Sequence, residues 1–532
     1  MLSSELKSKI NQLWDMFWSR GLSNPIQAIE QMSYLLFMRR LDQMDTEEIE
    51  KHQFSGTAYE SIFDGDWDTG KIDGEKKPIL IPKEELRWTN FKERETQDKY
   101  DHVKENVFPF IKSLNPKKSQ FSKHMENAVF LIPSPNLLED AIKSIDDIFK
   151  YIQSDRNKGQ EFQDTQGDVY EYLLSELKES GKNGQFRTPR HLIRFLVEII
   201  DPDRNDRICD PASGTGGFLL SAYQYILAKH TSEKDLIEDE DGFYHGKGDK
   251  IKDPKYWEKL WDDTFFGFDI DPTMVRIGLM NLMLHGIKVP HIENADTLSK
   301  KYEDRFQDGA YSVVLANPPF TGKISKTEKS DQFRVNTNST ELLFVDRIMK
   351  MLQTGGKGGV IIPEGVLFGS SKANKQLREL LLKDCQLEAV ISLPSGVFKP
   401  YTGVKTAILI FTKAQQGSQQ FHTEKVWFYQ LQSDGYSLDD NRRRLKDKPL
   451  PEAVQLWKER AEKSTTEERK GQHFFVPLEE IKENDYDLSF NRYKEFFYEE
   501  QRYDPPKKIL EALMALEKEI LRDMEELNDL VG

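Results

Sequence analysis

The sequence contains little cysteine, and this scarcity limits the kinds of protein that it can encode. Its 532 residues include two cysteines, Cys209 and Cys385, which lack the spacing of a metal-ligand pair, and its histidines are scattered. So few thiols exclude a disulfide framework and argue against a zinc site. We therefore expect no bound metal, and we expect the protein in a reducing cytoplasm.

Two further features are missing from the chain, namely a long apolar run and a phosphate-binding loop. No apolar run approaches the roughly 20 residues that a membrane-spanning helix requires, so we expect no membrane partner. The pattern GxxxxGK(S/T) does not occur, so nothing in the sequence indicates an ATPase.

The chain also lacks a net positive charge. The formal net charge of -15 argues against a broad, autonomous nucleic-acid surface. A local basic groove, or a partner subunit that supplies the positive charge, remains compatible with this value. With 37% hydrophobic and 31% charged residues, the composition is typical of a soluble globular protein with enough chain for about two or three domains.

Residues 1–179 are predicted to form a helical N-terminal domain. Apolar residues recur at helical spacing near its start, at Leu6, Ile10, Leu13 and Phe17. A second helix is predicted to begin at Pro25, because proline favours the first helical turn. Further helices are expected over residues 102–114 and 138–152, and the polar stretch at 64–78 is expected to be a loop.

Residues 180–430 show a different pattern, in which short apolar runs alternate with helical stretches. The apolar runs include "RICD", "TFFGFD", "YSVVLAN", "GGVIIP", "LEAVISLP" and "KTAILIFT". Alternation of this kind predicts a mostly parallel sheet with helices on both faces, in which loops at the C-terminal strand ends form the ligand crevice. We therefore predict an α/β fold with a Rossmann-like core.

Three other segments complete the predicted organisation. The acidic insertion at 231–263 is expected to be a solvated loop, and residues 431–503 are predicted to be a connector. Residues 504–532 are predicted to form a helix, capped by Asp504 with Pro505 in its first turn. Its apolar residues form a heptad-like seam at Ile509, Leu513, Leu516, Ile520, Met524, Leu527 and Val531. Such a seam packs on its own domain or, as we favour, docks a partner.

The stretch "CDPASGTGGFL" places a glycine-rich turn after the first strand of the core. Asp210 lies at the strand tip and Ser213 follows it, and Gly214, Gly216 and Gly217, with Thr215 among them, form the turn into a helix. Small residues let a ligand approach the backbone, and the following helix offers free N–H groups. Many dinucleotide-binding folds have a similar turn, so this turn alone does not identify the ligand.

Acidic residues follow the next two apolar runs. Asp269 ends "TFFGFD", where a carboxylate can accept both ribose hydroxyls of a nucleoside cofactor. Asp271 is predicted to cap the next helix. Asp296 follows the third run, where its carboxylate could accept from an adenine amino group. Each of these residues, taken alone, is more often a cap or turn residue.

The stretch "VVLANPPFTGK" ends a predicted strand with two prolines, which cannot donate to a sheet. The amine of a nucleobase is a poor nucleophile, because its lone pair is delocalised into the ring. The side-chain oxygen of Asn317 and the carbonyl of Pro318, held by Pro319, could accept both of its N–H groups. Phe320, predicted to be exposed, offers a face for a base taken out of the helix. The electrophile that fits is a sulfonium methyl donor held by the glycine turn and Asp269.

These motifs together resemble a known family. "NPPF" resembles the catalytic motif of amino-group DNA methyltransferases, and "DPASGTGGFL" resembles their S-adenosyl-L-methionine motif. "GQFRTPRHLIRFLVEII" resembles a third motif that completes the cofactor pocket, which adds Gln185, Phe186, Arg187, Thr188, Pro189 and Arg190 to the predicted cofactor residues. The motif order matches the γ arrangement of adenine-N6 enzymes, and the asparagine form of the tetrapeptide favours adenine over cytosine.

The resemblance extends over nearly the whole chain. The three motifs, the helical N-terminal domain, "DYDLSFNRY" and the helical tail resemble the modification subunit of type I restriction–modification systems. That family implies a specificity subunit that reads double-stranded DNA, two modification subunits for each specificity subunit, and a restriction or motor subunit. If the specificity subunit makes most of the DNA contacts, the net negative charge of this chain is also explained.

The residues leave other functions open. A stand-alone γ-type DNA adenine methyltransferase is the nearest alternative, and a protein-glutamine methyltransferase is another, because a similar tetrapeptide can bind a carboxamide nitrogen. A non-catalytic assembly scaffold is a third. The segment at 321–339 carries four Lys or Arg against two Asp or Glu. We predict that it is a mobile loop that orders around the flipped base, with a merely solvated loop as the alternative.

Overall fold

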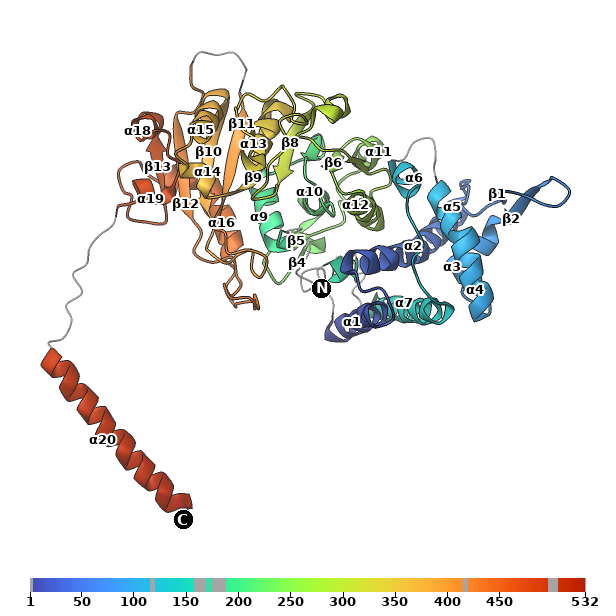
Figure 1. Cartoon of the computed structure of the whole chain (residues 1–532), viewed down its shortest axis with the longest axis horizontal. Coiled ribbons are helices and arrows are strands. Elements are labelled where there is room, and N and C mark those ends of the chain that lie inside the picture. Colours follow the sequence, from blue (N-terminus) through green and yellow to red (C-terminus); the bar gives the residue numbers. More distant parts are fainter. Residues whose placement is uncertain are drawn as a thin grey trace. The chain divides into compact units, whose positions relative to one another are not determined.

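The computed structural model describes residues 3–114, 120–156, 169–170, 172–174, 188–414, 420–495 and 506–531. The chain divides into two compact units, Met1–Tyr493 and Lys494–Gly532. The first unit contains a helical N-terminal region and an α/β region built on a central sheet (Figure 1).

The N-terminal region is helical, as predicted. Helix α1 (Ser4–Ser19) buries all four residues of the predicted apolar stripe. Helix α2 (Pro25–Ser55) begins at Pro25, and Asn24 caps it. The predicted helices further along are confirmed as a helical run over residues 96–113 and as α7 (Pro135–Arg156). The run consists of α4 (Thr96–His102), the π-helix η2 (Val103–Val107) and α5 (Phe108–Ser113), and the shorter elements are η1 (Lys83–Leu86), α3 (Trp88–Phe91) and α6 (Gln120–Met125).

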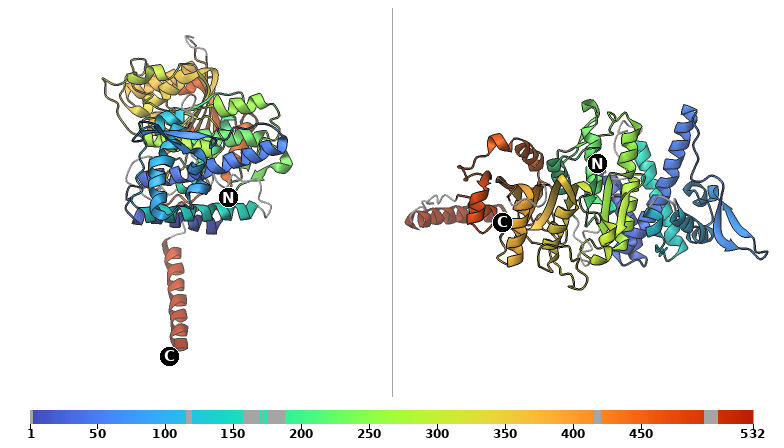
Figure 2. Two further views of the ribbon diagram at one scale, coloured as in Figure 1. Left: turned by 90° about the vertical axis from the view of Figure 1, so that its right-hand side faces the viewer. Right: turned by 90° about the horizontal axis from the view of Figure 1, so that it is seen from above.

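The polar stretch at 64–78 is not a loop, so that prediction was wrong. It forms most of a hairpin of β1 (Asp66–Ile72) and β2 (Pro78–Pro82), which projects from the N-terminal region (Figure 1, Figure 2). The Asp73 carboxylate closes its turn by accepting from the backbone N–H groups of Glu75 and Lys77. Because these strands are largely exposed, they lack the apolar alternation by which a strand is recognised in a sequence.

The α/β region contains a nine-stranded sheet in the order β13-β12-β10-β11-β9-β8-β3-β6-β7. Strands β3, β6, β7, β8 and β9 pair in parallel, whereas β11 runs antiparallel to both of its neighbours. The strand bounds are β3 (Ile208–Asp210), β6 (Phe265–Asp269), β7 (His291–Asn294), β8 (Tyr311–Ala316), β9 (Leu352–Pro363), β10 (Cys385–Ser392), β11 (Thr406–Lys413), β12 (Lys425–Gln430) and β13 (His473–Pro477).

Both faces of the sheet are covered, as the α/β prediction requires. Along β8, Val313 and Leu315 belong to one buried cluster, and Val314 and Ala316 belong to another. One cluster includes residues of α9 (Arg190–Ile200), α10 (Gly217–Lys229), α12 (Pro272–Leu284) and α16 (Pro449–Lys458). The other includes residues of α13 (Thr340–Met351), α14 (Gly365–Phe368), α15 (Lys372–Asp384), α18 (Leu478–Glu483) and α19 (Phe490–Tyr493). The short helices η4 (Lys300–Arg305) and α17 (Arg460–Lys463) complete this region.

Two segments differ from a simple loop or connector. The insertion at 231–263 folds into η3 (Glu233–Asp235), β4 (Ile237–Glu238), β5 (Tyr244–His245) and α11 (Pro254–Asp262). Its Asp241 carboxylate accepts from Tyr436 at 3.0 Å and pairs with Arg444 at 3.0 Å, so the insertion is not merely solvated. In the predicted connector, β13 pairs antiparallel with β12 and extends the sheet. The bounds of the four predicted domains, 1–179, 180–430, 431–503 and 504–532, stay predictions.

The second unit consists of the helix α20 (Pro506–Val531), which confirms the predicted helical tail. Asp504 and Pro505, the predicted cap and first-turn residues, lie outside the described residues. The exposed large apolar side chains of α20 are Ile509, Leu510, Leu513, Met514, Leu516, Ile520, Leu521, Met524, Leu527 and Leu530. Across the described parts of the chain, neither α20 nor another helix has the length and apolar character to span a bilayer.

Candidate active site

The glycine-rich turn joins β3 to α10 in a compact, left-handed path. Gly214 and Gly216 have φ values of 50° and 77°, which glycine adopts without strain. The Ser213 N–H donates to the Phe268 carbonyl of β6 at 2.9 Å, and the Gly216 N–H donates to the Ser213 carbonyl at 2.8 Å. The turn is therefore fixed against the end of β6, which places the predicted turn residues next to Asp269.

Helix α12 supports this turn through two residues that the sequence motifs did not identify. The Asn281 side chain, fully buried, donates to the Thr215 carbonyl at 2.9 Å. At Gly278, a β-carbon would lie 3.1 Å from the Gly214 carbonyl oxygen and 2.8 Å from Ile292. A glycine at this position thus lets α12 pack closely under the turn, and in the sequence it stands out only as a glycine inside a largely apolar helix.

Asp269 lies at the C-terminal end of β6 and contacts the turn directly. One carboxylate oxygen accepts from the Gly214 N–H at 2.9 Å, and the other accepts from the Asp271 N–H at 2.8 Å. Burial raises the pKa of this carboxyl. Asp271 caps α12 by accepting from the Thr273 N–H at 2.8 Å, as predicted.

The other two predicted carboxyls flank the same strand ends. Asp210 is 1% exposed and accepts from the Ala212 N–H at 3.0 Å. Burial, together with the charge of Asp269, raises the pKa of Asp210 to about 8. Asp296 follows β7, where the Ala295 N–H donates to the Asp269 carbonyl. Its carboxylate accepts from the Leu298 N–H at 2.9 Å, and burial raises its pKa.

Asn317 immediately follows β8, the strand next to β3. Its Nδ2 donates to Thr188 Oγ1 at 2.8 Å. Its Oδ1 is buried and has no hydrogen-bond partner among the residues that the structure describes. A buried acceptor without a partner is unusual, and it identifies a point where a ligand donor can bind. Pro318 is buried and Pro319 is exposed.

Phe320 is not exposed, so that part of the prediction was wrong. It is 4% exposed and contacts Phe398 edge to face, with ring centroids 5.2 Å apart. Phe398 belongs to the loop between β10 and β11, whose return to this point is not evident from local sequence patterns. Stacking of a base on Phe320 therefore requires one of these rings to move.

Only part of the third motif, at residues 184–200, lies within the described residues. Thr188 and Pro189 are buried, and Arg190 is exposed at the start of α9. Gln185, Phe186 and Arg187 lie outside the described residues. The structure places Thr188 in contact with Asn317 of the tetrapeptide, whereas the prediction assigned Thr188 only to the cofactor.

The segment at 321–339 is folded onto the residues that follow Asp296. The Ser330 N–H donates to the Leu298 carbonyl, and the Lys300 N–H donates to the Glu328 carbonyl, each at 2.9 Å. Arg334 anchors its far end through an ion pair with Asp346 at 2.7 Å. The mobility of this segment stays a prediction.

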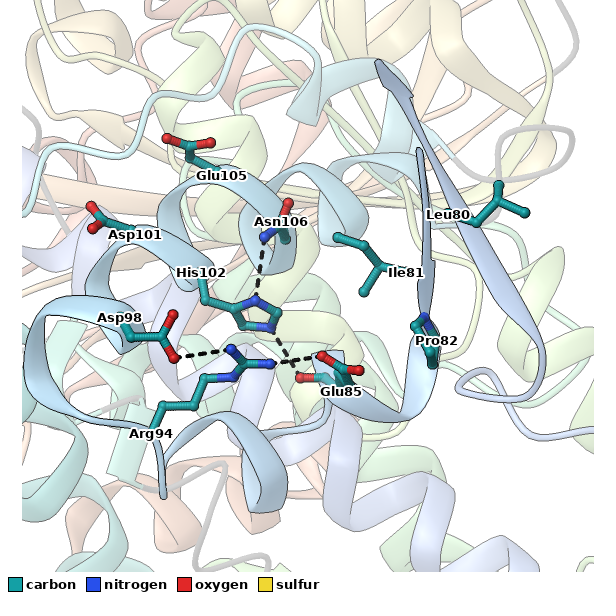
Figure 3. A pocket seen from close by; sticks show the side chains of 10 residues that line it. All are labelled: Leu80, Ile81, Pro82, Glu85, Arg94, Asp98, Asp101, His102, Glu105 and Asn106. Atoms are coloured by element: carbon teal, nitrogen blue, oxygen red, sulfur yellow. Dashed lines mark hydrogen bonds and ion pairs between the residues drawn. The ribbon is translucent and has the colours of Figure 1, made fainter. Parts of the chain in front are cut away.

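A separate hollow of about 450 Å³ lies in the N-terminal region between the hairpin and α4 (Figure 3). Arg94 pairs there with Glu85 at 2.7 Å and Asp98 at 3.0 Å, and His102 lies between the Glu85 carbonyl and Asn106. Its lining includes none of the predicted catalytic or cofactor residues. The polar groups that converge in it are largely paired with one another.

Comparison with known proteins gives a consistent family. Residues 161–502 match the model of the N-6 DNA Methylase family, and residues 6–145 match the HsdM N-terminal domain. A type I restriction enzyme EcoEI methylase subunit from Escherichia coli is 28% identical over 99% of this chain and 98% of its own length. The StySPI methylase subunit from Salmonella potsdam is 30% identical over 66% of this chain and 63% of its own length.

Solved structures agree with this likeness. A chain from a study of complex assembly and conformational transition of the type I R-M system is 27% identical, with a TM-score of 0.63 over 99% of this chain and 98% of that one. A type I methyltransferase subunit from Streptococcus thermophilus is 20% identical and has a TM-score of 0.65 over 93% of this chain and 100% of that one. At 20% identity, the Streptococcus thermophilus structure shows only that the fold is shared.

Proposed function

The chain belongs to the N-6 DNA methylase family, and from that premise we propose that it is the modification subunit of a type I restriction–modification complex. It is a site-specific DNA-methyltransferase that methylates N6 of adenine. The likeness to type I methylase subunits over nearly the full chain supports this function over the stand-alone and protein-glutamine alternatives. Within the site, the observation that carries it is the buried Oδ1 of Asn317 at the C-terminal end of β8, which has no hydrogen-bond partner within the described ranges.

The residues of the crevice fit S-adenosyl-L-methionine. A β-carbon at Gly214 would meet no atom of the described residues within 4 Å, which leaves room for a ligand on this side of the turn. Asp269 has lone pairs left for ribose hydroxyls, and Asp296 follows at the next strand end. When bound, this cofactor supplies an electrophilic methyl group on a sulfonium. We assign its binding to the glycine turn, Asp210, Asp269, Asp296 and residues 185–190.

Asn317 and Pro318 prepare the adenine amine for transfer. Asn317 Oδ1 and the Pro318 carbonyl accept its two N–H groups, which favours a pyramidal nitrogen whose lone pair is free to attack. Both acceptors are amide oxygens and are far too weakly basic to keep a proton. The proton that N6 loses after methylation therefore passes to water. The residues hold and orient the amine, and they do not act as a general base.

DNA contact falls to exposed cations on two segments around the tetrapeptide. Within 321–339, Lys323 and Lys326 are exposed, and among the described residues their side chains form no ion pair. In the run Arg442–Arg444, the outer arginines pair with Asp434 and Asp241. Arg443 is exposed and has no ion pair within the same described ranges. We assign phosphate contacts to these three side chains.

Two contacts link the segment around Arg443 to the tetrapeptide. Lys399 pairs with Asp440 at 3.4 Å, which ties the segment around Arg443 to the loop of Phe398. Phe398 in turn contacts Phe320 of the tetrapeptide. Exposed cations thus lie on the segment that follows the tetrapeptide and on a segment linked to it through Lys399 and Phe398, although the chain as a whole is acidic.

The partners are proposed from the family. They are a specificity subunit that reads double-stranded DNA, with two modification subunits for each, and a restriction or motor subunit in the cytoplasm. Helix α20, with its broad apolar surface, is the segment that we assign to subunit docking.

The test is methyl transfer from labelled S-adenosyl-L-methionine to unmethylated DNA, by this chain alone and with the specificity subunit from its own locus. We expect N6-methyladenine in the complex, little from the chain alone, and none from an Asn317→Ala complex that still binds cofactor. Activity from the chain alone would support a stand-alone enzyme. Cofactor binding without transfer in the wild-type complex would support a scaffold.

A further inference from the structure

The contact between Thr188 and Asn317 joins two motifs that lie far apart in the sequence. Thr188 is 7% exposed, and its Oγ1 accepts from Asn317 Nδ2 at 2.8 Å. Pro189, which follows Thr188 directly, precedes the first turn of α9, so the backbone at this point is constrained. The hydroxyl is therefore held at a fixed place beside the catalytic amide.

The orientation of the Asn317 amide decides whether it can bind the target amine. A carboxamide presents an acceptor on one side and a donor on the other, and rotation about the terminal bond exchanges them. In the structure Nδ2 is paired with Thr188, and Oδ1 has no hydrogen-bond partner in the described part of the chain. In the exchanged orientation, Nδ2 would face the N–H groups of adenine, donor against donor.

We propose that Thr188 is a positioning residue that holds the Asn317 amide in the productive orientation. This inference rests on the proposed function and adds a role for the third motif. With adenine bound, the observed orientation alone gives both ends of the amide a partner of the correct kind. Without the Thr188 hydroxyl, Nδ2 loses the acceptor that it has among the described residues, so the amide is held less firmly in this orientation.

The same contact gives the cofactor segment a second task. Residues 185–190 are assigned to the cofactor pocket by resemblance, and Thr188 within them touches the group that receives the base. The placement of Thr188 therefore affects the amide directly. Orientation of the amide acts on the methyl-transfer step and not on cofactor affinity, so the two tasks are separable by experiment.

The experiment compares Thr188→Val, Thr188→Ser and wild type in the complex with the specificity subunit. Valine keeps the volume and removes the acceptor, whereas serine keeps the acceptor. At saturating S-adenosyl-L-methionine, where a change in cofactor affinity does not enter the rate, we expect Thr188→Val to lower the single-turnover transfer rate by about 10-fold or more, with DNA affinity within about 3-fold of wild type. Thr188→Ser should restore most of the rate.

A matched control is Thr264→Val, because Thr264 is fully buried and donates to the Lys259 carbonyl at the opposite end of β6 from Asp269. It tests the general cost of replacing a buried threonine. We expect it to leave the transfer rate unchanged. An equal loss of rate in both variants would overturn the proposal.

A second background makes the test specific to orientation. Asn317→Asp places oxygens on both sides of the group, so no orientation has to be selected. In this background, adding Thr188→Val should cost much less than it costs with Asn317. An equal cost in both backgrounds, a wild-type rate in Thr188→Val, or a loss confined to cofactor affinity would each refute the positioning role. Failure of the proposed function looks different, because the wild-type complex would then form no N6-methyladenine.

Discussion

Arg276 of α12 forms a buried ion pair with Glu30 of α2, at 2.5 Å between Nη2 and Oε1. Both side chains are less than a tenth exposed, and Tyr34 donates to the same carboxylate oxygen at 2.7 Å. The pair joins the helical N-terminal region to the helix that supports the glycine turn, since Asn281 of α12 holds the Thr215 carbonyl. The two regions are therefore coupled through a charged contact that water cannot easily replace.

The first prediction concerns this pair. Glu30→Ala leaves the Arg276 cation buried without its partner, and we expect a loss of about 3–5 kcal/mol in the free energy of unfolding. Chemical denaturation followed by circular dichroism measures it. The control is the double variant Glu30→Leu, Arg276→Met, which removes both charges and should recover most of the loss. If the double variant is as unstable as Glu30→Ala, the loss does not come from an uncompensated charge.

The second prediction separates cofactor affinity from helix stability. Asp269→Ala removes the carboxylate that accepts from Gly214 and is assigned to the ribose, so we expect S-adenosyl-L-methionine to bind at least about 10-fold more weakly by calorimetry. Asp253→Ala is the matched control, because Asp253 caps α11 by accepting from the Lys255 N–H. It should lower stability by about 1 kcal/mol and leave the affinity unchanged. Equal affinities of wild type and Asp269→Ala would remove Asp269 from the cofactor site.

The third prediction follows from the buried carboxyl of Asp210. Its pKa rises from an ordinary 3.8 to about 8, chiefly through burial, so the folded protein binds this proton more tightly than the unfolded chain. The stability that the protonated group contributes is fully present below pH 3.8 and is lost as the pH rises through about 8. Between about pH 6 and pH 9, wild type should therefore lose roughly 2 kcal/mol more than Asp210→Asn.

Denaturation curves at the two pH values provide this measurement, and Asp15→Asn, at a carboxyl of α1 far from the crevice in sequence, is the control. The control should follow wild type. A pH dependence of Asp210→Asn that equals that of wild type would mean that Asp210 is already ionised in the folded protein at the lower pH.

The fourth prediction concerns phosphate contacts. In the complex, replacing Lys323, Lys326 or Arg443 by alanine should weaken DNA binding for all sequences alike. The slope of log affinity against log salt concentration should become shallower by about 0.9 for each phosphate that is no longer neutralised. Lys255→Ala is the control, because Lys255 is exposed on α11, which leads into β6 at the end opposite Asp269. An unchanged salt slope in all three variants would exclude these side chains from the DNA interface.

The sequence predicted those parts of the fold in which burial imposes a pattern. Strands β3, β6 and β8 are buried on both faces, so their apolar runs are easily recognised in the sequence. Because these strands are parallel, the glycine turn and the acidic residues that follow them lie at the same end of the sheet. The hairpin over 66–82 buries little and left no such pattern. Contacts such as Thr188 with Asn317, and Phe320 with Phe398, depend on how distant loops meet. No local spacing encodes that approach.

The fifth prediction concerns α20, whose apolar residues form two adjacent stripes. The stripe through Leu513, Leu516 and Ile520 belongs to the heptad-like seam, and Leu510 and Leu521 lie beside it. We expect an apolar surface this wide to be buried against a partner, because about ten large apolar side chains would otherwise face water. We expect Leu513→Glu with Ile520→Glu to prevent assembly with the specificity subunit, as measured by analytical ultracentrifugation.

The matched control for α20 is Lys518→Glu, a charge change of the same helix at a polar position. It should assemble normally. Because the glutamates in the seam variant are far from the glycine turn in sequence and belong to a separate compact unit, its affinity for S-adenosyl-L-methionine should equal that of wild type. A seam variant that still assembles would assign docking to another surface of the chain. A seam variant that loses cofactor affinity instead would show that α20 supports the catalytic unit and not a partner.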